Sequence, residues 1–256
     1  MGRHIIIGDV HGMKPEVMSL IDFIDPREDD HIVFVGDLVD KGDDSPGVVR
    51  FVRELSESRP GMVVVVEGNH EDKHRRFRRN SEVRPEVAKG MVERQPELAD
   101  ITDAMSAEDI AFMDGFVPFH RIPEHGIMVV HGGIPASMDS FPESVEEARA
   151  FGGKRKKAFQ CIMRTRHVHH ESGKMVPMGS ESEADPFWAD VYDGRFGHVV
   201  FGHEPFMDGP RKFPHAIGVD TGAVFGGRLT AMVVDADGSR SFVSVPGRPV
   251  ADRRHC

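Results

Sequence analysis

The stretch that decides the fold lies near the start of the chain, where residues 4–12 read HIIIGDVHG. Three consecutive isoleucines indicate a short buried β-strand, and the Gly-Asp step marks its end. Pro15 then suits the first turn of a helix. Apolar residues follow at the spacing of one helix face, at Val17, Leu20, Ile21 and Ile24. The segment therefore predicts a strand, a polar loop and a helix in succession.

The same order recurs in the next sixty residues. Residues 31–35 form a second apolar run that ends in Gly36 and Asp37, and residues 62–66 form a third that ends in EGNH. The third run is almost entirely β-branched, which is typical of a strand buried on both faces. Alternating strands and helices predict an α/β architecture with right-handed crossovers.

The rest of the chain has a less regular pattern. Residues 72–125 predict a helical, charged region, and residues 163–185 predict a long loop of the kind that often carries function. Strands are expected over residues 127–130, 198–201, 216–219, 229–235 and 241–245. We predict a single domain over residues 1–245 and a polar C-terminal tail over residues 246–256.

Composition narrows the classes of function. The chain has 256 residues, with 32 Lys and Arg against 42 Asp and Glu, which gives a net charge of -10. This balance argues against stable nucleic-acid binding, which depends on many cationic contacts to phosphates. Its apolar runs are shorter than the roughly 20 residues of a membrane span, so no membrane association is expected. With only two cysteines, a reducing cytoplasmic setting is predicted.

Two dense basic runs stand out in this acidic chain. They are residues 74–79 (HRRFRR) and residues 154–157 (KRKK). Such runs are usually solvated helix faces. They would instead favour a polyanionic substrate if they faced the functional site.

Six predicted strands end in residues that can bind a metal or transfer a proton. These residues are Asp9 and His11, Asp37 and Asp40, Asn69 and His70, His131, His203, and Asp220. A single Gly-Asp step after a strand is usually only a turn, but six such strand ends are not independent accidents. Ligands of α/β proteins bind at the carboxyl ends of strands. We therefore expect these side chains to converge, with Asp220 either in the site or capping the last sheet.

Two Asp, one Asn and three His would form a ligand set of oxygen and nitrogen without sulfur. That set suits a pair of Mn, Fe or Zn ions rather than structural zinc or an iron-sulfur cluster. Two divalent ions, two carboxylates and a bridging hydroxide leave positive charge that attracts a phosphoryl group. Such a site lowers the pKa of bound water toward ~7 and holds both oxygens of an in-line displacement. The predicted reaction is hydrolysis of a phosphate ester or anhydride.

The motifs around these residues resemble those of the calcineurin-like metallophosphoesterases. Within that family they are most similar to the branch of the phosphoprotein phosphatases and bacterial diadenosine tetraphosphatases. The similar motifs occur in the family's order, at residues 8–12, 36–42, 68–71, 131–133, 202–203 and 220–222. The resemblance implies the family fold, a β-sandwich flanked by helices in four α/β/β/α layers, with the metals at one edge.

The resemblance also implies a role for each residue. Asp9 and His11 would hold the first metal and Asp37 would bridge both ions. The second metal would be completed by Asn69, His131 and His203. His70 would protonate the leaving oxygen, oriented by Asp40, whose carboxylate favours the imidazolium form. The implied cofactor is two divalent ions, with manganese placed before iron, zinc or nickel.

Two departures from the family pattern lie near the expected site. Lys41 stands where the family's phosphatases commonly have Arg, and Lys cannot hold two phosphate oxygens in a planar fork. Phosphate positioning would then be looser, or shared with Arg164 or Arg166. Glu204 stands where a threonine is usual and adds a carboxylate near the site.

The predicted enzyme attacks directly with the bridging hydroxide, without a covalent intermediate. Its substrate stays open among a phosphoprotein, a dinucleoside polyphosphate and a small phosphoester. The alternative is a non-catalytic module that binds a phosphorylated ligand on the same fold. Loss of Asp37, Asn69 or His70 would favour that alternative, and all three are present.

Overall fold

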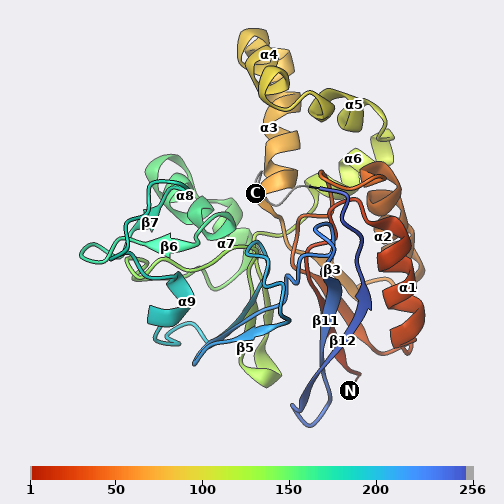
Figure 1. Cartoon of the computed structure of the whole chain (residues 1–256), viewed down its shortest axis with the longest axis vertical. Coiled ribbons are helices and arrows are strands. Elements are labelled where there is room, and N and C mark those ends of the chain that lie inside the picture. The colour runs from red at the N-terminus through yellow and green to blue at the C-terminus, as the bar shows by residue number, and fades with distance from the viewer. Residues whose placement is uncertain (1, 252–256) are drawn as a thin grey trace.

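The computed structural model describes residues 2–251, and two five-stranded sheets form its centre (Figure 1). The first sheet has the order β12-β11-β1-β2-β3 and the second has the order β4-β5-β8-β10-β9. The first contains β1 (His4–Ile7), β2 (His31–Phe34), β3 (Val63–Val65), β11 (Arg228–Val234) and β12 (Arg240–Pro246). The second contains β4 (His120–Ile122), β5 (Ile127–Val129), β8 (His198–Phe201), β9 (Arg211–Lys212) and β10 (Ala216–Gly218).

Helices cover the outer faces of both sheets. On the first sheet lie α1 (Lys14–Ile24), α2 (Ser45–Ser58) and α6 (Ala107–Asp114). On the second lie the shorter α7 (Val145–Arg149), α8 (Gly153–Phe159) and α9 (Trp188–Val191), with the 3₁₀ turn η2 (Gln160–Met163). The helices α3 (Asn69–Val83), α4 (Pro85–Arg94) and α5 (Glu97–Asp103) project from one end of the molecule (Figure 1).

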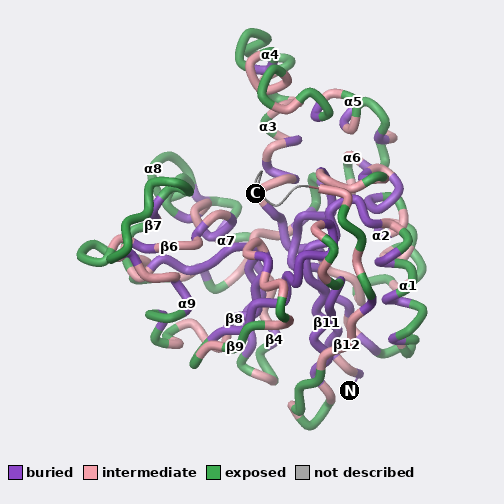
Figure 2. Tube along the Cα trace, viewed as in Figure 1, coloured by how far each residue is buried: buried purple, intermediate pink, exposed green. Residues whose placement is uncertain are grey.

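Strand alternation explains how the layers are held together. Ile6 of β1 packs between the two sheets with Val33 and Val200, whereas Ile5 and Ile7 face the helices on the other side. All three isoleucines are completely buried, and each contributes roughly 1.5–3 kcal/mol to folding. Figure 2 shows the strands as the buried centre of the molecule. The arrangement confirms the predicted four-layer α/β/β/α sandwich.

Each sheet contributes three parallel strands to the same edge. In the first sheet β1, β2 and β3 run parallel, and in the second β5, β8 and β10 do so. These six strands are the ones whose ends carry the predicted motifs. Because parallel strands present their carboxyl ends together, the motifs meet at one edge of the sandwich.

Several local expectations were wrong or incomplete. The region predicted to be helical contains β4, which pairs with β5. The strand β3 was expected to be buried on both faces, yet Val63 and Val64 are only half-buried because β3 lies at the edge of its sheet. The predicted loop over residues 163–185 contains a small hairpin of β6 (His167–Val168) and β7 (Met175–Val176).

The predicted tail is only partly described. Gly247 donates its backbone N–H to the Gly227 carbonyl, and Val250 and Ala251 donate theirs to the Val224 carbonyl. Residues 247–251 therefore follow the surface of the first sheet's loops. Residues 252–256 lie outside the described part of the chain.

Histidines also gather at the ends of the strands opposite the site. His4 stacks on His31 with ring centroids 5.0 Å apart. The turn η1 (Pro123–His125) brings the His125 ring centroid to 5.6 Å from that of His4. Burial, together with the charges of His4 and His31, lowers the pKa of His120 to about 4. Burial beside Arg240 and His215 lowers the pKa of His198 to about 4 as well.

These two shifts predict that acid destabilises the protein. Between pH 6.5 and 4 the unfolded chain takes up protons at His120 and His198 while the folded chain does not, so stability falls as the pH falls. Allowing for their partial exposure, we expect the free energy of unfolding to drop by ~1 kcal/mol per histidine between pH 7 and 5. Urea unfolding of the wild type and of a His120→Gln/His198→Gln variant measures this. Identical pH slopes for the two proteins would contradict it.

Candidate metal and phosphate site

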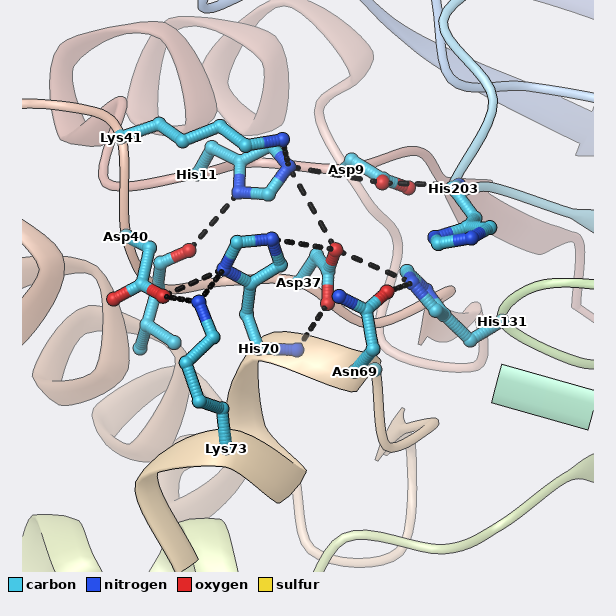
Figure 3. Close-up of polar contacts among 12 residues, drawn as sticks. Asp9, His11, Asp37, Asp40, Lys41, Asn69, His70, Lys73, His131 and His203 are labelled. Atoms are coloured by element: carbon cyan, nitrogen blue, oxygen red, sulfur yellow. Dashed lines mark hydrogen bonds and ion pairs between the residues drawn. The ribbon is translucent and has the colours of Figure 1, made fainter. Parts of the chain in front are cut away.

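Asp37 lies at the centre of the converging side chains (Figure 3). Its Oδ2 is 3.2 Å from Nε2 of His131, 3.7 Å from Nε2 of His11 and 3.8 Å from Nε2 of His70. Two groups of possible metal ligands share this carboxylate: one adds His11 and His70, the other His131 and His203. Asp37 therefore has the position of a ligand common to two cations.

The electrostatics of the centre favour positive charge. Burial alone would lower the pKa of His131, but the adjacent carboxylate of Asp37 outweighs it and raises that pKa to about 9. Conversely, burial would raise the pKa of Asp37, but the charges of His131 and His70 hold it well below its usual range. Two buried partners that each stabilise the other's charge show how strongly this position attracts a cation.

Asp9 supplies a direct test of whether a metal fits. Its Oδ2 accepts a hydrogen bond from the backbone N–H of His203 at 3.0 Å, whereas its Oδ1 is buried and has no hydrogen-bond partner among residues 2–251. Burial and the nearby carboxylate of Asp220 raise the pKa of Asp9 well above its usual value. A buried carboxylate oxygen without a partner is costly. A cation at this atom would remove that cost, so the residues fit a metal.

Two histidines are oriented by the backbone as metal ligands usually are. Nδ1 of His11 lies 2.9 Å from the Val39 carbonyl, and Nδ1 of His131 lies 3.0 Å from the Val35 carbonyl. A carbonyl oxygen only accepts, so each Nδ1 carries the proton. A histidine binds metal in its neutral form, and with the proton on Nδ1 the Nε2 of each ring would then present its lone pair on the side of Asp37.

The backbone around the site is held in rarely adopted conformations. Apart from Asp25, the non-glycine residues with positive φ in the described chain are all here: His11, Asp37, Asp40, Lys41 and His203. Such strain is common at functional sites. Glycine makes the close approach possible, because a Cβ at position 68 would lie 2.1 Å from Asp37 Oδ1 and one at position 202 would lie 1.9 Å from Asp9 Oδ1.

The remaining predicted ligand comes from the start of α3. Asn69 Oδ1 lies 3.0 Å from Nε2 of His131, whose ring centroid is 5.1 Å from that of His203. The structure thus brings together all the side chains expected to bind metal, namely Asp9, His11, Asp37, Asn69, His131 and His203. Their use as ligands stays a prediction.

His70 and Asp40 form the predicted pair, with Nδ1 of His70 2.6 Å from Oδ2 of Asp40. Burial lowers the pKa of His70, and the carboxylates of Asp37 and Asp40 oppose that shift without overcoming it. Asp40 therefore acts in the expected direction, towards the imidazolium form, but burial has the larger effect. With Nδ1 held by Asp40, the Nε2 of His70 is directed towards Asp37 and the cavity.

Sequence reasoning missed two further partners of Asp40. Nζ of Lys73 is 2.8 Å from Asp40 Oδ2, and Nε2 of His74 is 2.8 Å from Asp40 Oδ1. Hydrogen bonds from His70 and His74 hold the pKa of Asp40 well below its usual range although burial opposes them. The signal was present, because positions three and four residues after His70 lie on the same helix face. His74 also belongs to the basic run of residues 74–79, and such a run alone indicates only a solvated helix face.

The environment of His74 fixes its hydrogen-bonding role. Its Nδ1 is 2.7 Å from Thr102 Oγ1, and that hydroxyl donates to the Leu98 carbonyl at 2.8 Å. Because a carboxylate only accepts, Nε2 donates to Asp40. His74 therefore holds the Asp40 oxygen that His70 does not contact, and Thr102 fixes the other side of the His74 ring.

Glu71 is a third residue whose role the sequence did not show. Its two carboxylate oxygens accept the backbone N–H groups of Asp37 (2.9 Å), Leu38 (2.7 Å) and Gly68 (2.9 Å). Burial and the charge of Asp37 raise its pKa to about 8, against the effect of these hydrogen bonds. Glu71 thus joins the loops that follow β2 and β3 and fixes the position of Asp37.

A cavity of about 390 Å³ opens above this centre. Asp37, Asn69, His70 and His203 line its floor, and residues of the 163–185 loop, such as Met175 and Met178, line one wall. The cations that border it are Lys41, Lys73, Arg164 and Arg166. All three residues predicted to bind substrate therefore face the same cavity, and Lys73 is added to them.

Neighbouring groups hold these cations in place. Arg166 donates to the His203 carbonyl at 2.8 Å and forms an ion pair with Glu204 at 2.9 Å, which gives Glu204 a contact in the site. Nζ of Lys41 lies 3.1 Å from Nε2 of His11 and 5.2 Å from the centroid of the Phe225 ring. That nitrogen of His11 is the one implied to bind metal, so a bound cation and the Lys41 ammonium would exclude each other there.

Asp220 was expected either to join the site or to cap a loop. Its Oδ1 accepts the backbone N–H of Gly222 at 2.9 Å, which is a capping contact. Burial raises its pKa to about 6. Its charge also raises the pKa of Asp9, so Asp220 affects the centre through Asp9.

None of the helices within residues 2–251 combines the length and the apolar character needed to cross a membrane.

Comparison with known proteins gives one consistent result. The family model of the calcineurin-like phosphoesterases matches residues 2–207. The bis(5'-nucleosyl)-tetraphosphatase PrpE [asymmetrical] of Halalkalibacterium halodurans is 30% identical over 257 residues, covering 95% of this chain and 93% of the relative. The protein of the same name from Bacillus subtilis is 31% identical over 239 residues, covering 88% of each chain.

Solved structures agree with these relatives. A crystal structure proposed to be a diadenosine tetraphosphatase superimposes with a TM-score of 0.71 at 27% identity, covering 97% of this chain and 95% of the other. A serine/threonine phosphatase of Saccharomyces cerevisiae superimposes with a TM-score of 0.67 at 15% identity, covering 98% and 81%. At that identity the second likeness concerns the fold alone.

Proposed function

Because the chain belongs to the calcineurin-like phosphoesterases and is a metal-dependent hydrolase of phosphoesters, we propose that its substrate is a bis(5'-nucleosyl) tetraphosphate, cleaved asymmetrically. The observation that carries this proposal is the set of four cations, Lys41, Lys73, Arg164 and Arg166, around one cavity above Asp37. A single phosphoryl group occupies only a small part of this cavity. A chain of four phosphates extends far enough to contact cations on several of its sides.

The metal ligands in this proposal are the six converging side chains. Asp9 and His11 would hold one divalent ion, and Asp37 would contribute to both ions. The second ion would be held by Asn69, His131 and His203. Manganese is our first choice for both positions. Bound divalent ions supply Lewis acidity and make water a stronger nucleophile at neutral pH.

The protein's own groups then act on the phosphate chain. Arg166, fixed by Glu204 and the His203 carbonyl, presents a planar guanidinium that can hold two phosphate oxygens. Lys41 adds a point charge. Nε2 of His70 donates a proton to the oxygen of the leaving group, since its Nδ1 is held by Asp40.

Rates on three substrates test the proposal. With manganese present, kcat/KM for diadenosine tetraphosphate is expected to exceed that for a phosphoserine peptide and for an aryl phosphate by about tenfold or more, because only the first engages all four cations. Asymmetric cleavage gives a nucleoside mono- and triphosphate, which chromatography separates. A higher rate on the peptide, or two equal diphosphate products, would overturn the proposal. Binding without turnover of any substrate would favour the non-catalytic alternative.

The cellular setting belongs to the same proposal. A nucleotide substrate agrees with the reducing, cytoplasmic location predicted from the two cysteines.

A further inference from the structure

A second cavity of about 640 Å³ lies beside the candidate site, lined by residues of α3, α8 and η2. Six cationic side chains line it: Arg75, Arg76, Arg79, Lys156, Lys157 and Arg164. Of the residues that the structure describes, Asp72 is the one acidic residue in its lining. We call this cavity the basic groove. The two basic runs of the sequence thus face each other across one groove instead of covering separate helix faces.

The basic groove adjoins the candidate site. Arg164 lines both cavities. The helix α3 begins at Asn69 and His70 and carries Arg75, Arg76 and Arg79 outward, so Arg79 lies about 15 Å along the helix axis from Asn69. A third cavity, of about 450 Å³, shares Arg76 and Arg79 and adds Arg84. A line of cations therefore leads away from His70 along α3.

Acidic side chains balance only part of this charge. Asp72 forms ion pairs with Arg75 and Arg76 at 3.0 Å and with Arg164 at 2.5 Å, and Glu67 pairs with Arg75. Arg79, Lys156 and Lys157 form no side-chain ion pair with any residue of the described chain. Like charges gathered in a concave surface raise the local concentration of anions. Although the protein has a net charge of -10, an excess of positive charge is concentrated in this groove beside the site.

The chemistry of the lining indicates which anion fits. Proteins that bind single-stranded nucleic acids stack bases on aromatic side chains. Within residues 2–251, no aromatic residue lines this groove or the cavity that follows it. The available groups are guanidinium and ammonium ions, which bind phosphate oxygens. An extended chain of phosphates without bases matches this lining better than an oligonucleotide does.

We propose that the basic groove binds linear inorganic polyphosphate and that the enzyme hydrolyses this polymer from its end, a second activity that uses the site of the proposed function. The oxygen of water bonds to the terminal phosphorus, and the bond from that phosphorus to the bridging oxygen breaks. The bridging oxygen stays on the shortened chain and receives the proton of His70. The products are one orthophosphate and a chain one phosphate shorter, with no change in oxidation state.

The experiment compares two double variants that lose the same charge. Lys156→Ala/Lys157→Ala removes two cations of the groove, and Lys154→Ala/Lys212→Ala removes two lysines outside its lining. Binding of long-chain polyphosphate is measured by calorimetry on each double variant combined with His70→Asn, which slows hydrolysis. The kcat/KM for polyphosphate is measured on each double variant with His70 intact. The groove variant is expected to lose about tenfold in polyphosphate affinity and about tenfold in this kcat/KM. Its kcat/KM for diadenosine tetraphosphate is expected to match the control's.

Each result decides between the proposals. Equal polyphosphate binding by the two double variants would overturn the proposal that the basic groove binds polyphosphate. A single-stranded oligonucleotide that binds as tightly as polyphosphate would overturn it too. Wild-type hydrolysis of diadenosine tetraphosphate but not of polyphosphate would overturn this inference and leave the proposed function intact. Lysine-dependent binding of polyphosphate without hydrolysis of diadenosine tetraphosphate would support the groove and overturn the proposed function.

Discussion

Replacing Asp37 with Asn is expected to lower kcat/KM by about 10³-fold or more on every phosphate substrate, which corresponds to ~4 kcal/mol of transition-state stabilisation. The amide keeps the size of the side chain but removes the charge that three imidazole nitrogens surround at 3.2–3.8 Å. Both groups of possible metal ligands contain this carboxylate. The variant should therefore lose metal from both positions, which elemental analysis of dialysed protein measures.

The control for this change is an aspartate of no expected function. Asp22→Asn alters an exposed residue of α1 and should leave metal content and rate unchanged. The role of Asp37 would be refuted by an Asp37→Asn variant that keeps both its metal and its activity.

Replacing His70 with Asn is expected to lower turnover by about 10²–10⁴-fold on substrates with poor leaving groups while metal content stays the same. The reason is that Nε2 of His70 faces the cavity and its proton is needed only when the leaving oxygen is basic. On a nitrophenyl phosphate, whose leaving group is a weak base, the loss should be much smaller. The measurement is the ratio of kcat for phenyl phosphate to kcat for nitrophenyl phosphate in each protein.

An exposed histidine serves as the matched control. His215→Asn should leave that ratio as it is in the wild type. A His70→Asn variant with equal losses on both substrates would show that His70 does not act as the proton donor.

The sequence was sufficient to predict the main architecture because function and fold share the same residues. The apolar runs before Asp9, Asp37 and His203 are strands, and parallel strands must present their carboxyl ends at one edge. The convergence of side chains almost two hundred residues apart therefore followed from strand periodicity. Strand periodicity does not show which strand lies at the edge of a sheet, so the partial exposure of Val63 and Val64 in β3 could not be predicted.

Contacts between helices and loops were harder to foresee. The hydrogen bonds of Glu71 to the loop after β2, and of His74 to Asp40 and Thr102, depend on the direction in which α3 leaves the end of β3. The same holds for Glu204, whose pairing with Arg166 depends on the path of the 163–185 loop. Helix periodicity placed His74 near His70 but could not identify its partners.

The basic runs show the same limit. Each run alone reads as a solvated helix face, and only the packing of α8 near α3 places Lys156 and Arg79 in one groove. No pattern along the chain encodes the distance between two helices that are separated by seventy residues.

The number of metal ions bound per chain tests the central interpretation most directly. Wild-type protein, stripped with chelator, reloaded with manganese and dialysed, should contain two ions per chain by elemental analysis, because Asp37 is shared between two sets of ligands. Activity should return only as the second ion binds. Full activity with a single ion per chain, or after complete removal of metal, would contradict it.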